Sequence, residues 1–174
     1  ITSESTFGFT NPAYPIQPAG LGFKFNGTQM LYEGGVMIGA KKSGLIRVSD
    51  NLRDSLVIDS DFSRILAASD INPAVYGDKE VEVTISDTGN TNSLGILVKQ
   101  TSDAWTTTPD DNYVIMTYEI INMDTAVALQ EMYAGIFADW DIWDFSLNRA
   151  SFDNANRMGY TFSSQAISPY AGIK

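Results

Sequence analysis

Four aspartates in the last quarter of the sequence are the residues best suited to bind a metal ion. They lie within fifteen residues of one another and directly follow an apolar and aromatic run at 132–138. They are Asp139, Asp141, Asp144 and Asp153. If 132–141 forms a strand, Asp139 and Asp141 project from one face about 7 Å apart. Carboxylate oxygens are the ligands of hard cations, so the pattern predicts a candidate calcium site.

The same aspartates have a second interpretation that needs no metal. The twelve-residue loop of an EF-hand is missing, because no glycine stands in the required place and no glutamate closes the loop. Aspartates in irregular loops commonly accept hydrogen bonds from nearby backbone N–H groups. Calcium binding and hydrogen bonding are therefore alternative roles for this cluster.

Carbohydrate chemistry is a further alternative, because it uses the same residue types. Glycosidases hold two carboxylates about 5 Å apart or further, and the pairs Asp139/Asp141 and Glu119/Glu131 could be proposed. Aromatic rings beside carboxylates also suit a carbohydrate-binding face. The aromatic candidates are Tyr133 and Phe137 on the predicted strand and Trp105, Trp143 and Phe145 in predicted loops. Large aromatics that close the ends of a sandwich are the structural alternative.

Histidine and cysteine are both absent, and this removes several classes of site. Disulfides cannot form, a Ser-His-Asp or Cys-His catalytic set cannot be built, and zinc or copper would lack their usual ligands. The chain therefore offers only oxygen ligands to a metal. We expect a protein that is not an enzyme, with no cofactor other than a candidate calcium ion.

The net charge of −10 narrows the range of partners. A chain this acidic repels phosphate backbones and anionic membrane surfaces, so nucleic-acid binding is not expected. Membrane insertion is not expected either, because the sequence has no apolar stretch near 18 residues. Positive charge gathers at Lys41, Lys42, Arg47 and Arg53. This group is either a solvated strand and turn face or a patch that docks an acidic neighbour.

Short strands separated by polar turns must position these residues. Asn26-Gly27 predicts a hairpin turn, because both residues accept positive φ, and a second hairpin is expected around Lys41-Lys42-Ser43-Gly44. The expected strands are 22–25, 28–32, 36–40, 45–48, 55–62, 79–85, 94–99, 113–123, 127–140 and 158–162. The strand at 113–123 is apolar at successive positions, as in a central strand covered on both faces. The pattern predicts an all-β fold, a single antiparallel β-sandwich domain over 1–174.

Alternation within these strands predicts the hydrophobic core. Val81, Val83 and Ile85 share one face of the 79–85 strand, while charged residues take the other face. The expected core residues are Val81, Val83, Ile85, Ile96, Val98, Ile115, Ile120, Ile136 and Trp140.

Two segments resemble a known family. The first is Tyr133-Ala134-Gly135-Ile136-Phe137-Ala138-Asp139-Trp140-Asp141-Ile142, followed by Asn148, Asp153, Asn156 and Met158-Gly159-Tyr160; the second is 31–39 with 48–53. They are similar to β-sandwich regions of large exported Bacteroidetes proteins, found downstream of subtilisin-like (S8) peptidase domains. Trp143 stands where a glycine often occurs in that pattern.

The resemblance implies a non-catalytic accessory or interaction domain of a secreted, periplasmic or cell-surface multidomain protein, the parent being in some cases a peptidase. The chain would then be a fragment of a longer exported protein, and its partner a neighbouring domain, a surface protein or a glycan. The alternative function is a carbohydrate-binding module or glycosidase fragment. The family context also implies O-glycosylation sites at Ser55 and Thr125.

Overall fold

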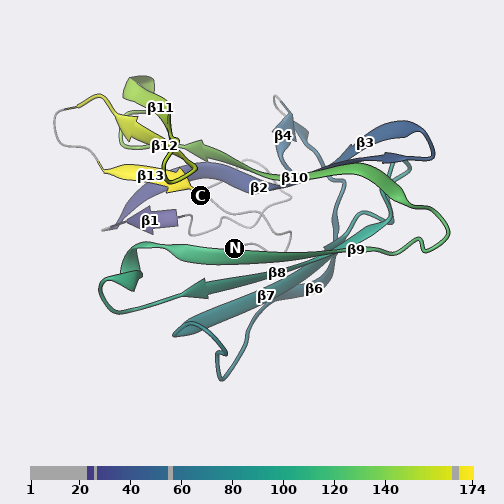
Figure 1. Cartoon of the computed structure of the whole chain (residues 1–174). Helices are drawn as coiled ribbons and strands as arrows, with labels where there is room; N and C mark the ends of the chain where they lie inside the picture. Colours follow the sequence, from purple (N-terminus) through teal and green to yellow (C-terminus); the bar gives the residue numbers. More distant parts are fainter. Residues whose placement is uncertain (1–22, 26, 55–56, 166–168) are drawn as a thin grey trace. The chain divides into compact units, whose positions relative to one another are not determined.

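The structure, a computed structural model, describes residues 23–25, 27–54, 57–165 and 169–174, with the backbone alone at 29, 53, 54, 57 and 58. The chain is built from strands (Figure 1). All strand pairs whose register is described are antiparallel. The predicted class, an all-β antiparallel sandwich, is confirmed.

The strands vary widely in length. They are β1 (Phe23–Phe25), β2 (Thr28–Lys42), β3 (Leu45–Ser49), β4 (Arg53–Asp54), β5 (Val57–Ile58), β6 (Ser63–Asp70), β7 (Lys79–Ser86), β8 (Ile96–Ala104), β9 (Val114–Asn122), β10 (Leu129–Trp140), β11 (Asn148–Asp153), β12 (Met158–Ser163) and β13 (Tyr170–Ile173). Within the described residues the helices are two 3-10 turns, η1 (Asp110–Asn112) and η2 (Phe145–Leu147). Neither is long enough to cross a membrane.

The described residues divide into two compact units. Unit 1 is 35–137, and unit 2 combines 23–34 with 138–174. The long strands β2 and β10 are neighbours in one sheet, and each passes from one unit into the other. The assignment of 1–174 to a single domain stays a prediction.

Unit 1 is a sandwich of two sheets with the hydrophobic core between them. One sheet has the order β6-β7-β8-β9, and β3, the second half of β2 and most of β10 form the other layer (Figure 1). The core contains Val36, Ile38 and Ala40 from β2, Val83 and Ile85 from β7, and Ile96 and Val98 from β8, together with Phe62 and Leu94. Alternating positions on each strand supply these side chains, as a half-buried strand requires.

The β2–β3 hairpin forms where the sequence predicts it. Lys42 pairs with Leu45, so Ser43 and Gly44 are the two turn residues. Their φ angles are 51° and 81°, in the left-handed region that Asn, Ser and Gly tolerate in two-residue hairpins. The first hairpin is also found, with Phe25 opposite Thr28 and Gly27 at a φ of 79°, while Asn26 lies outside the described residues.

The predicted core is largely confirmed, with one clear error. Val83, Ile85, Ile96 and Val98 are buried, Ile120 and Ile136 pack against the core, and Val81 and Trp140 are half-buried. Ile115 is 47% exposed. It lies five positions from Ile120, so the two side chains point to opposite faces of β9. β9 is an edge strand of its sheet and not the doubly covered central strand that was predicted.

The alternation of buried and exposed side chains along β10 is regular only from Gly135 to Trp140. Leu129 and Ile136 both pack against the core, although an odd separation puts side chains of a regular strand on opposite faces. Glu131 between them has a φ of 49°, which marks an irregularity of the kind that a bulge introduces. Met132 and Ala134, which regular alternation would place on the same face as Ile136, are exposed.

The predicted strand at 55–62 is also replaced by other structure. β4 and β5 pair across residues 55–56, which lie outside the described residues, and 59–62 is irregular. Ser55, one of the two candidate glycosylation sites, therefore has no described position, whereas Thr125 is exposed.

Unit 2 contains the predicted aspartate cluster and a three-stranded sheet. Its sheet has the order β11-β12-β13. Met30, Leu31 and Ile142 are buried, and the Trp140 ring meets Phe23 edge to face with centroids 5.7 Å apart. The strand predicted at 158–162 is β12.

Candidate functional site

The aspartates predicted to bind calcium lie at the end of β10 and in the turns that follow it. Asp139 is exposed at the end of the strand. The backbone N–H of Asp141 donates to the carbonyl of Met30, and its carboxyl is half-buried. Burial raises the pKa of the Asp141 carboxyl, and the charge of Asp139 raises it further. The predicted spacing of the two carboxyls stays a prediction.

Asp144 and Asp153 have hydrogen-bond partners of their own. Asp144 caps η2 and accepts from the backbone N–H of Ser146 at 3.0 Å and from its hydroxyl at 2.6 Å. Asp153 accepts from the N–H groups of Ala155 and Asn156 and from the Asn156 amide at 2.7 Å. These hydrogen bonds lower the pKa of Asp153. Both residues have the turn-forming role that was the alternative to metal binding, and calcium at the four aspartates stays a prediction.

A different set of aspartates offers the best-placed ligands in the described part of the chain. One carboxylate oxygen from each of Asp50, Asp59 and Asp61 lies within 4.8 Å of the others. No such group of three forms among the four aspartates after β10, which are all described. Three oxygen donors at this spacing suit a hard cation such as calcium, although exposed carboxylates also gather without one.

Asn51 brings together Asp50 and Asp61, at the two ends of the acidic loop that these three aspartates define. Its side chain donates to the carbonyl of Phe62 at 3.1 Å and accepts from the Phe62 N–H at 2.8 Å, in the manner of a strand pair. Asp50 and Asp61 therefore meet, and the Asp50 N–H donates to Asp61 Oδ2 at 3.2 Å. The amide of Asn90 also donates to Asp61 Oδ1.

The electrostatics of this loop are those of crowded carboxylates. Burial raises the pKa of Asp50, and the charge of Asp59 adds to the effect, although a hydrogen bond from Leu52 opposes it. Burial likewise raises the pKa of Asp61, as do its charged neighbours. An open pocket of about 400 Å³ adjoins the loop, lined by residues of the 59–63 segment and of 89–91. Sequence reasoning missed this group, and its only local signal is the Asp59-Ser60-Asp61 pattern.

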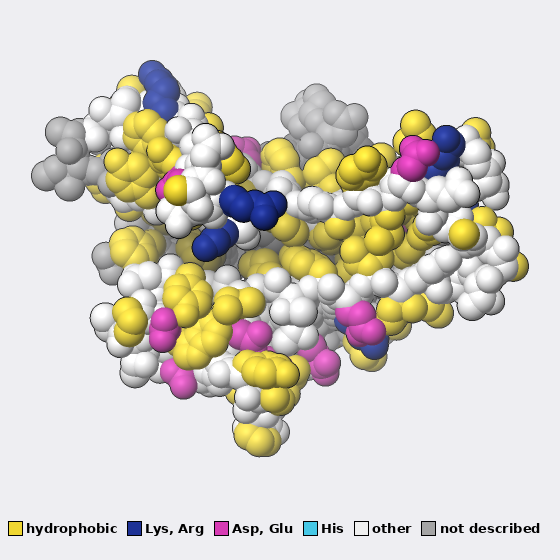
Figure 2. Space-filling model, in the orientation of Figure 1, with side chains coloured by type: hydrophobic (Ala, Val, Ile, Leu, Met, Phe, Trp, Pro, Cys, Tyr) yellow, Lys and Arg dark blue, Asp and Glu magenta, His cyan; other side chains and the backbone are white. Residues whose placement is uncertain are grey.

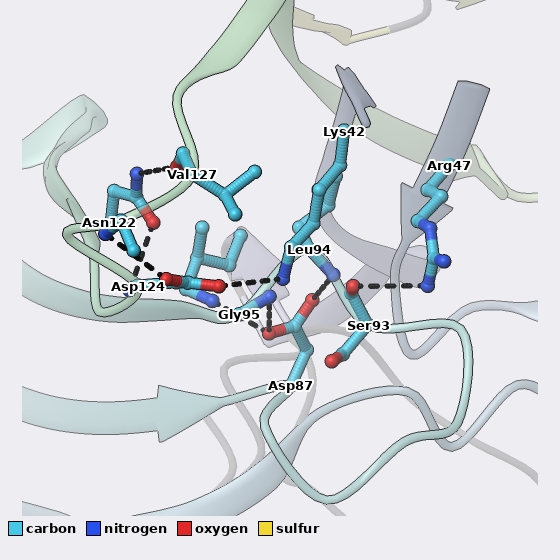
Figure 3. A network of polar contacts seen from close by, with 11 residues as sticks. Lys42, Arg47, Asp87, Ser93, Leu94, Gly95, Asn122, Asp124 and Val127 are labelled. Atoms are coloured by element: carbon cyan, nitrogen blue, oxygen red, sulfur yellow. Dashed lines mark hydrogen bonds and ion pairs between the residues drawn. The ribbon is translucent and has the colours of Figure 1, made fainter. Parts of the chain in front are cut away.

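The carboxylate of Asp87 organises the loop that forms the other side of this pocket. It is fully buried and accepts from the Ser49 hydroxyl at 2.7 Å. Figure 3 shows Asp87 beside Leu94 and Gly95. The backbone N–H groups of Leu94, Gly95 and Ile96 also donate to it, at 2.6, 3.0 and 2.7 Å. Gly95 has a φ of 78°, a conformation that favours glycine. Asp87 is therefore a structural anchor for the β7–β8 connection.

The cations of the predicted basic group contact their own chain. Lys41 pairs with Glu131 at 3.6 Å and Lys42 with Asp124 at 3.8 Å. Arg47 donates to the carbonyl of Ser93 at 3.3 Å (Figure 3). The side chain of Arg53 lies outside the described residues. The described cations of this group therefore form contacts with other residues of the same chain.

The glutamate pair considered for glycosidase chemistry does not form a site. Glu119 on β9 contacts Lys99 at 3.0 Å, and Glu131 on β10 contacts Lys41. The two strands belong to different sheets. Each glutamate therefore faces a lysine of its own sheet, and no cleft between the two carboxylates is found among the described residues.

Most of the candidate aromatics are exposed. Tyr133, Phe137, Trp143 and Phe145 are 76%, 41%, 47% and 72% exposed. Trp105 is half-buried and contacts Tyr113 with ring centroids 5.4 Å apart. The exposed rings do not close the ends of a sandwich and are free to contact a partner.

No family model, curated protein or solved structure matches this chain. The functional argument therefore rests on the residues themselves.

Proposed function

We propose that the chain is a non-catalytic interaction module of an exported multidomain protein. Its docking surface would be the outward side of the β3, β2 and β10 layer in unit 1, which we term the outer face. The observation that supports this proposal is a set of exposed apolar side chains on that side. They are Met37, Ile46, Val48, Tyr133 and Phe137, at 37%, 82%, 51%, 76% and 41% exposure.

Strand alternation places these residues on one side. Ile38 and Ala40 point into the core, so Met37, Gly39 and Lys41 point outward. Val48 pairs with Gly39 and Ile46 with Lys41, and directly opposed residues share a face.

The β10 residues follow from the same rule. Ile136 packs against the core, so Gly135 and Phe137 on either side of it point outward. Tyr133 is 76% exposed and lies two positions before Gly135 on the same strand. Gathered apolar residues on the outside of a sandwich are typical of a contact surface rather than of a free face.

The chemistry of the outer face indicates what kind of partner fits it. Gly39 and Gly135 carry no side chain, and a Cβ added at Gly135 would meet nothing within 4 Å. Lys41 and Glu131 neutralise one another at the edge of the face, and Figure 2 shows such a mixed pair at the end of the layer. Two copies with a net charge of −10 repel each other, which favours a neutral or basic partner. A neighbouring domain of the same polypeptide, with an apolar surface of its own, meets these requirements.

A side chain at Gly135 tests the docking surface in the full-length protein. Gly135→Gln should leave the melting temperature of the isolated chain unchanged, because the space above Gly135 is open. In the full-length protein it should separate the unfolding transition of this module from that of its neighbour in calorimetry. Thr117→Gln, on the exposed side of β9, is the matched control. Equal calorimetric traces for both variants would contradict the proposal.

An aromatic cluster in unit 2 supports the second candidate function, carbohydrate binding. Tyr160, Phe162 and Tyr170 have ring centroids 5.6–6.0 Å apart, with Phe162 and Tyr170 stacked and Tyr170 69% exposed. Flat aromatic surfaces of this kind stack on sugar rings. A glycan array would support this function if Tyr170→Ala abolished binding. Turnover of any bound polysaccharide would contradict a non-catalytic role.

A further inference from the structure

Two buried carboxyl side chains lie next to each other on the face of the β6-β7-β8-β9 sheet that is opposite the hydrophobic core. Glu80 on β7 and Asp103 on β8 are directly opposed in the strand register. Glu80 is three positions from Val83, and Asp103 is five from Val98, both core residues. An odd separation places both carboxyls on the face of the sheet opposite the core. Each is nevertheless only 5% exposed.

The β6–β7 loop, residues 71–78, covers this pair. The Glu80 Oε2 atom accepts from the N–H groups of Val75 at 2.5 Å and Tyr76 at 3.4 Å. The loop is further tied down where the Asp78 N–H donates to the Ala104 carbonyl at 3.0 Å. At Gly77 an added Cβ would lie 2.7 Å from the Ala104 oxygen, so the loop lies tight against β8. The loop projects from its sheet, with hydrophobic side chains at its tip (Figures 1 and 2).

The Asp103 carboxyl beneath this loop lacks one of its hydrogen-bond partners. Its Oδ1 atom is buried and receives no hydrogen bond. Among the described residues, no lysine or arginine forms an ion pair with Asp103 or Glu80. A buried acceptor without a donor costs free energy, and so do two like charges side by side. One proton on Asp103 would remove both costs, because the protonated carboxyl can donate to the Glu80 carboxylate.

We propose that Asp103 holds a proton facing the Glu80 carboxylate and that loss of this proton loosens the 71–78 loop, which is therefore a pH-sensitive latch on the side of the sheet opposite the core. The proton leaves Asp103 for solvent, and two facing carboxylates remain. The Glu80 carboxylate accepts the hydrogen bonds from the Val75 and Tyr76 N–H groups of the loop. Repulsion between the two carboxylates therefore acts on a residue that anchors the loop. The latch would control the presentation of Val75 and Tyr76, which are 68% and 78% exposed at the tip.

The direction of the pH dependence follows from a pKa of Asp103 that is raised when the loop is closed. Burial raises the pKa of Asp103, and the charge of Glu80 raises it further. A carboxyl whose pKa is raised in the closed state stabilises that state at acid pH, and the stabilisation is lost as pH rises through the raised value. The loop should therefore be held most firmly at acid pH.

Other charged groups around the pair have separate partners or point elsewhere. Asp78 accepts from the N–H and hydroxyl of Thr106, and Lys99 on β8 pairs with Glu119 on β9. The remaining charged residues on β6 and β7 are Arg64 and Asp70 on β6 and Lys79 and Glu82 on β7, all of them exposed.

A carbon-13 NMR titration of the Asp103 carboxyl tests the proton on Asp103 directly. The expected midpoint lies above 3.8, the ordinary value for aspartate, and should move toward 3.8 in Glu80→Gln. Glu82→Gln, an exposed change on the same face of the same strand, should leave the midpoint unchanged. A wild-type midpoint at or below 3.8 would overturn the proposal.

Hydrogen exchange at the Val75 and Tyr76 amides tests the latch. After correction for intrinsic rates, protection should fall as pH rises, by about tenfold for each unit by which the pKa of Asp103 is raised. Asp103→Asn keeps a donor for Glu80 and carries no charge, so its protection should stay high across the range. Protection that varies with pH equally in wild type and Asp103→Asn would show that this pair does not control the loop.

Discussion

Replacement of Asp87 by alanine should be one of the most damaging single changes in this chain. The substitution removes the acceptor for one hydroxyl and three backbone N–H groups, which lie in the interior of unit 1. It also releases the β7–β8 connection that carries Gly89, Asn90 and Thr91 beside the Asp50, Asp59 and Asp61 loop. The change therefore tests how the fold holds one side of the candidate site.

The expected magnitude follows from the count of orphaned donors. A buried donor left without a partner costs about 1–3 kcal/mol. Four such costs do not add fully, because water enters the space that the carboxylate leaves and the loop relaxes. We expect Asp87→Ala to lower the free energy of unfolding by at least about 3 kcal/mol, within the range for breaking a buried polar network. Ser49→Ala removes a single donor and should cost about 1 kcal/mol.

Urea unfolding followed by tryptophan fluorescence measures both changes. Asp87→Asn should fall between wild type and Asp87→Ala, since the amide keeps one acceptor oxygen but turns an NH₂ group toward donors. Asp70→Ala, an exposed aspartate at the end of β6, is the control and should stay within about 0.5 kcal/mol of wild type. A loss below about 1 kcal/mol for Asp87→Ala would refute the anchoring role.

Three further changes test the core and the acidic loops. Ile96→Ala, at a fully buried position, should cost about 2–5 kcal/mol in the same urea titration, and a cost near zero would contradict the core assignment. Asp61→Asn should raise the melting temperature near neutral pH, because the pKa of the Asp61 carboxyl is raised and its stabilising contribution is lost as pH rises. The gain should vanish at acid pH, and a lower melting temperature at neutral pH would contradict the prediction. Millimolar calcium should raise the melting temperature, and the double variant Asp139→Asn, Asp141→Asn should lose that response. If Asp59→Asn, Asp61→Asn loses it instead, the ion binds the other loop, and no response in wild type would remove calcium from the account.

Short-range patterns allowed much of the fold to be predicted. The alternation at 79–85 depends only on neighbouring residues, and β7 has the predicted face in the core. The Ser43-Gly44 turn likewise follows from two residues that tolerate positive φ. Asp144 and Asp153 have the local hydrogen bonds that short polar side chains in loops commonly make.

Features that depend on distant contacts could not be predicted. The apolar sequence of β9 is the same whether the strand is central or at an edge, and strand order decides that Ile115 is exposed. Asp50 and Asp61 meet because Asn51 pairs with Phe62, a contact that no periodicity signals. Glu80 is buried because a loop folds over the exposed side of β7, which alternation alone assigns to solvent.

Hydroxyl-radical footprinting of this chain alone and within the proposed multidomain protein tests the proposed docking surface most directly. The method reads side-chain exposure, and Met37, Tyr133 and Phe137 on the outer face all carry reactive side chains. In the isolated chain each should be modified readily, because all three are exposed. We expect strong protection of these three residues in the multidomain protein, with Tyr76 at the loop tip as reactive as before. Equal modification of Met37, Tyr133 and Phe137 in both forms would contradict the proposal that this face docks a neighbour.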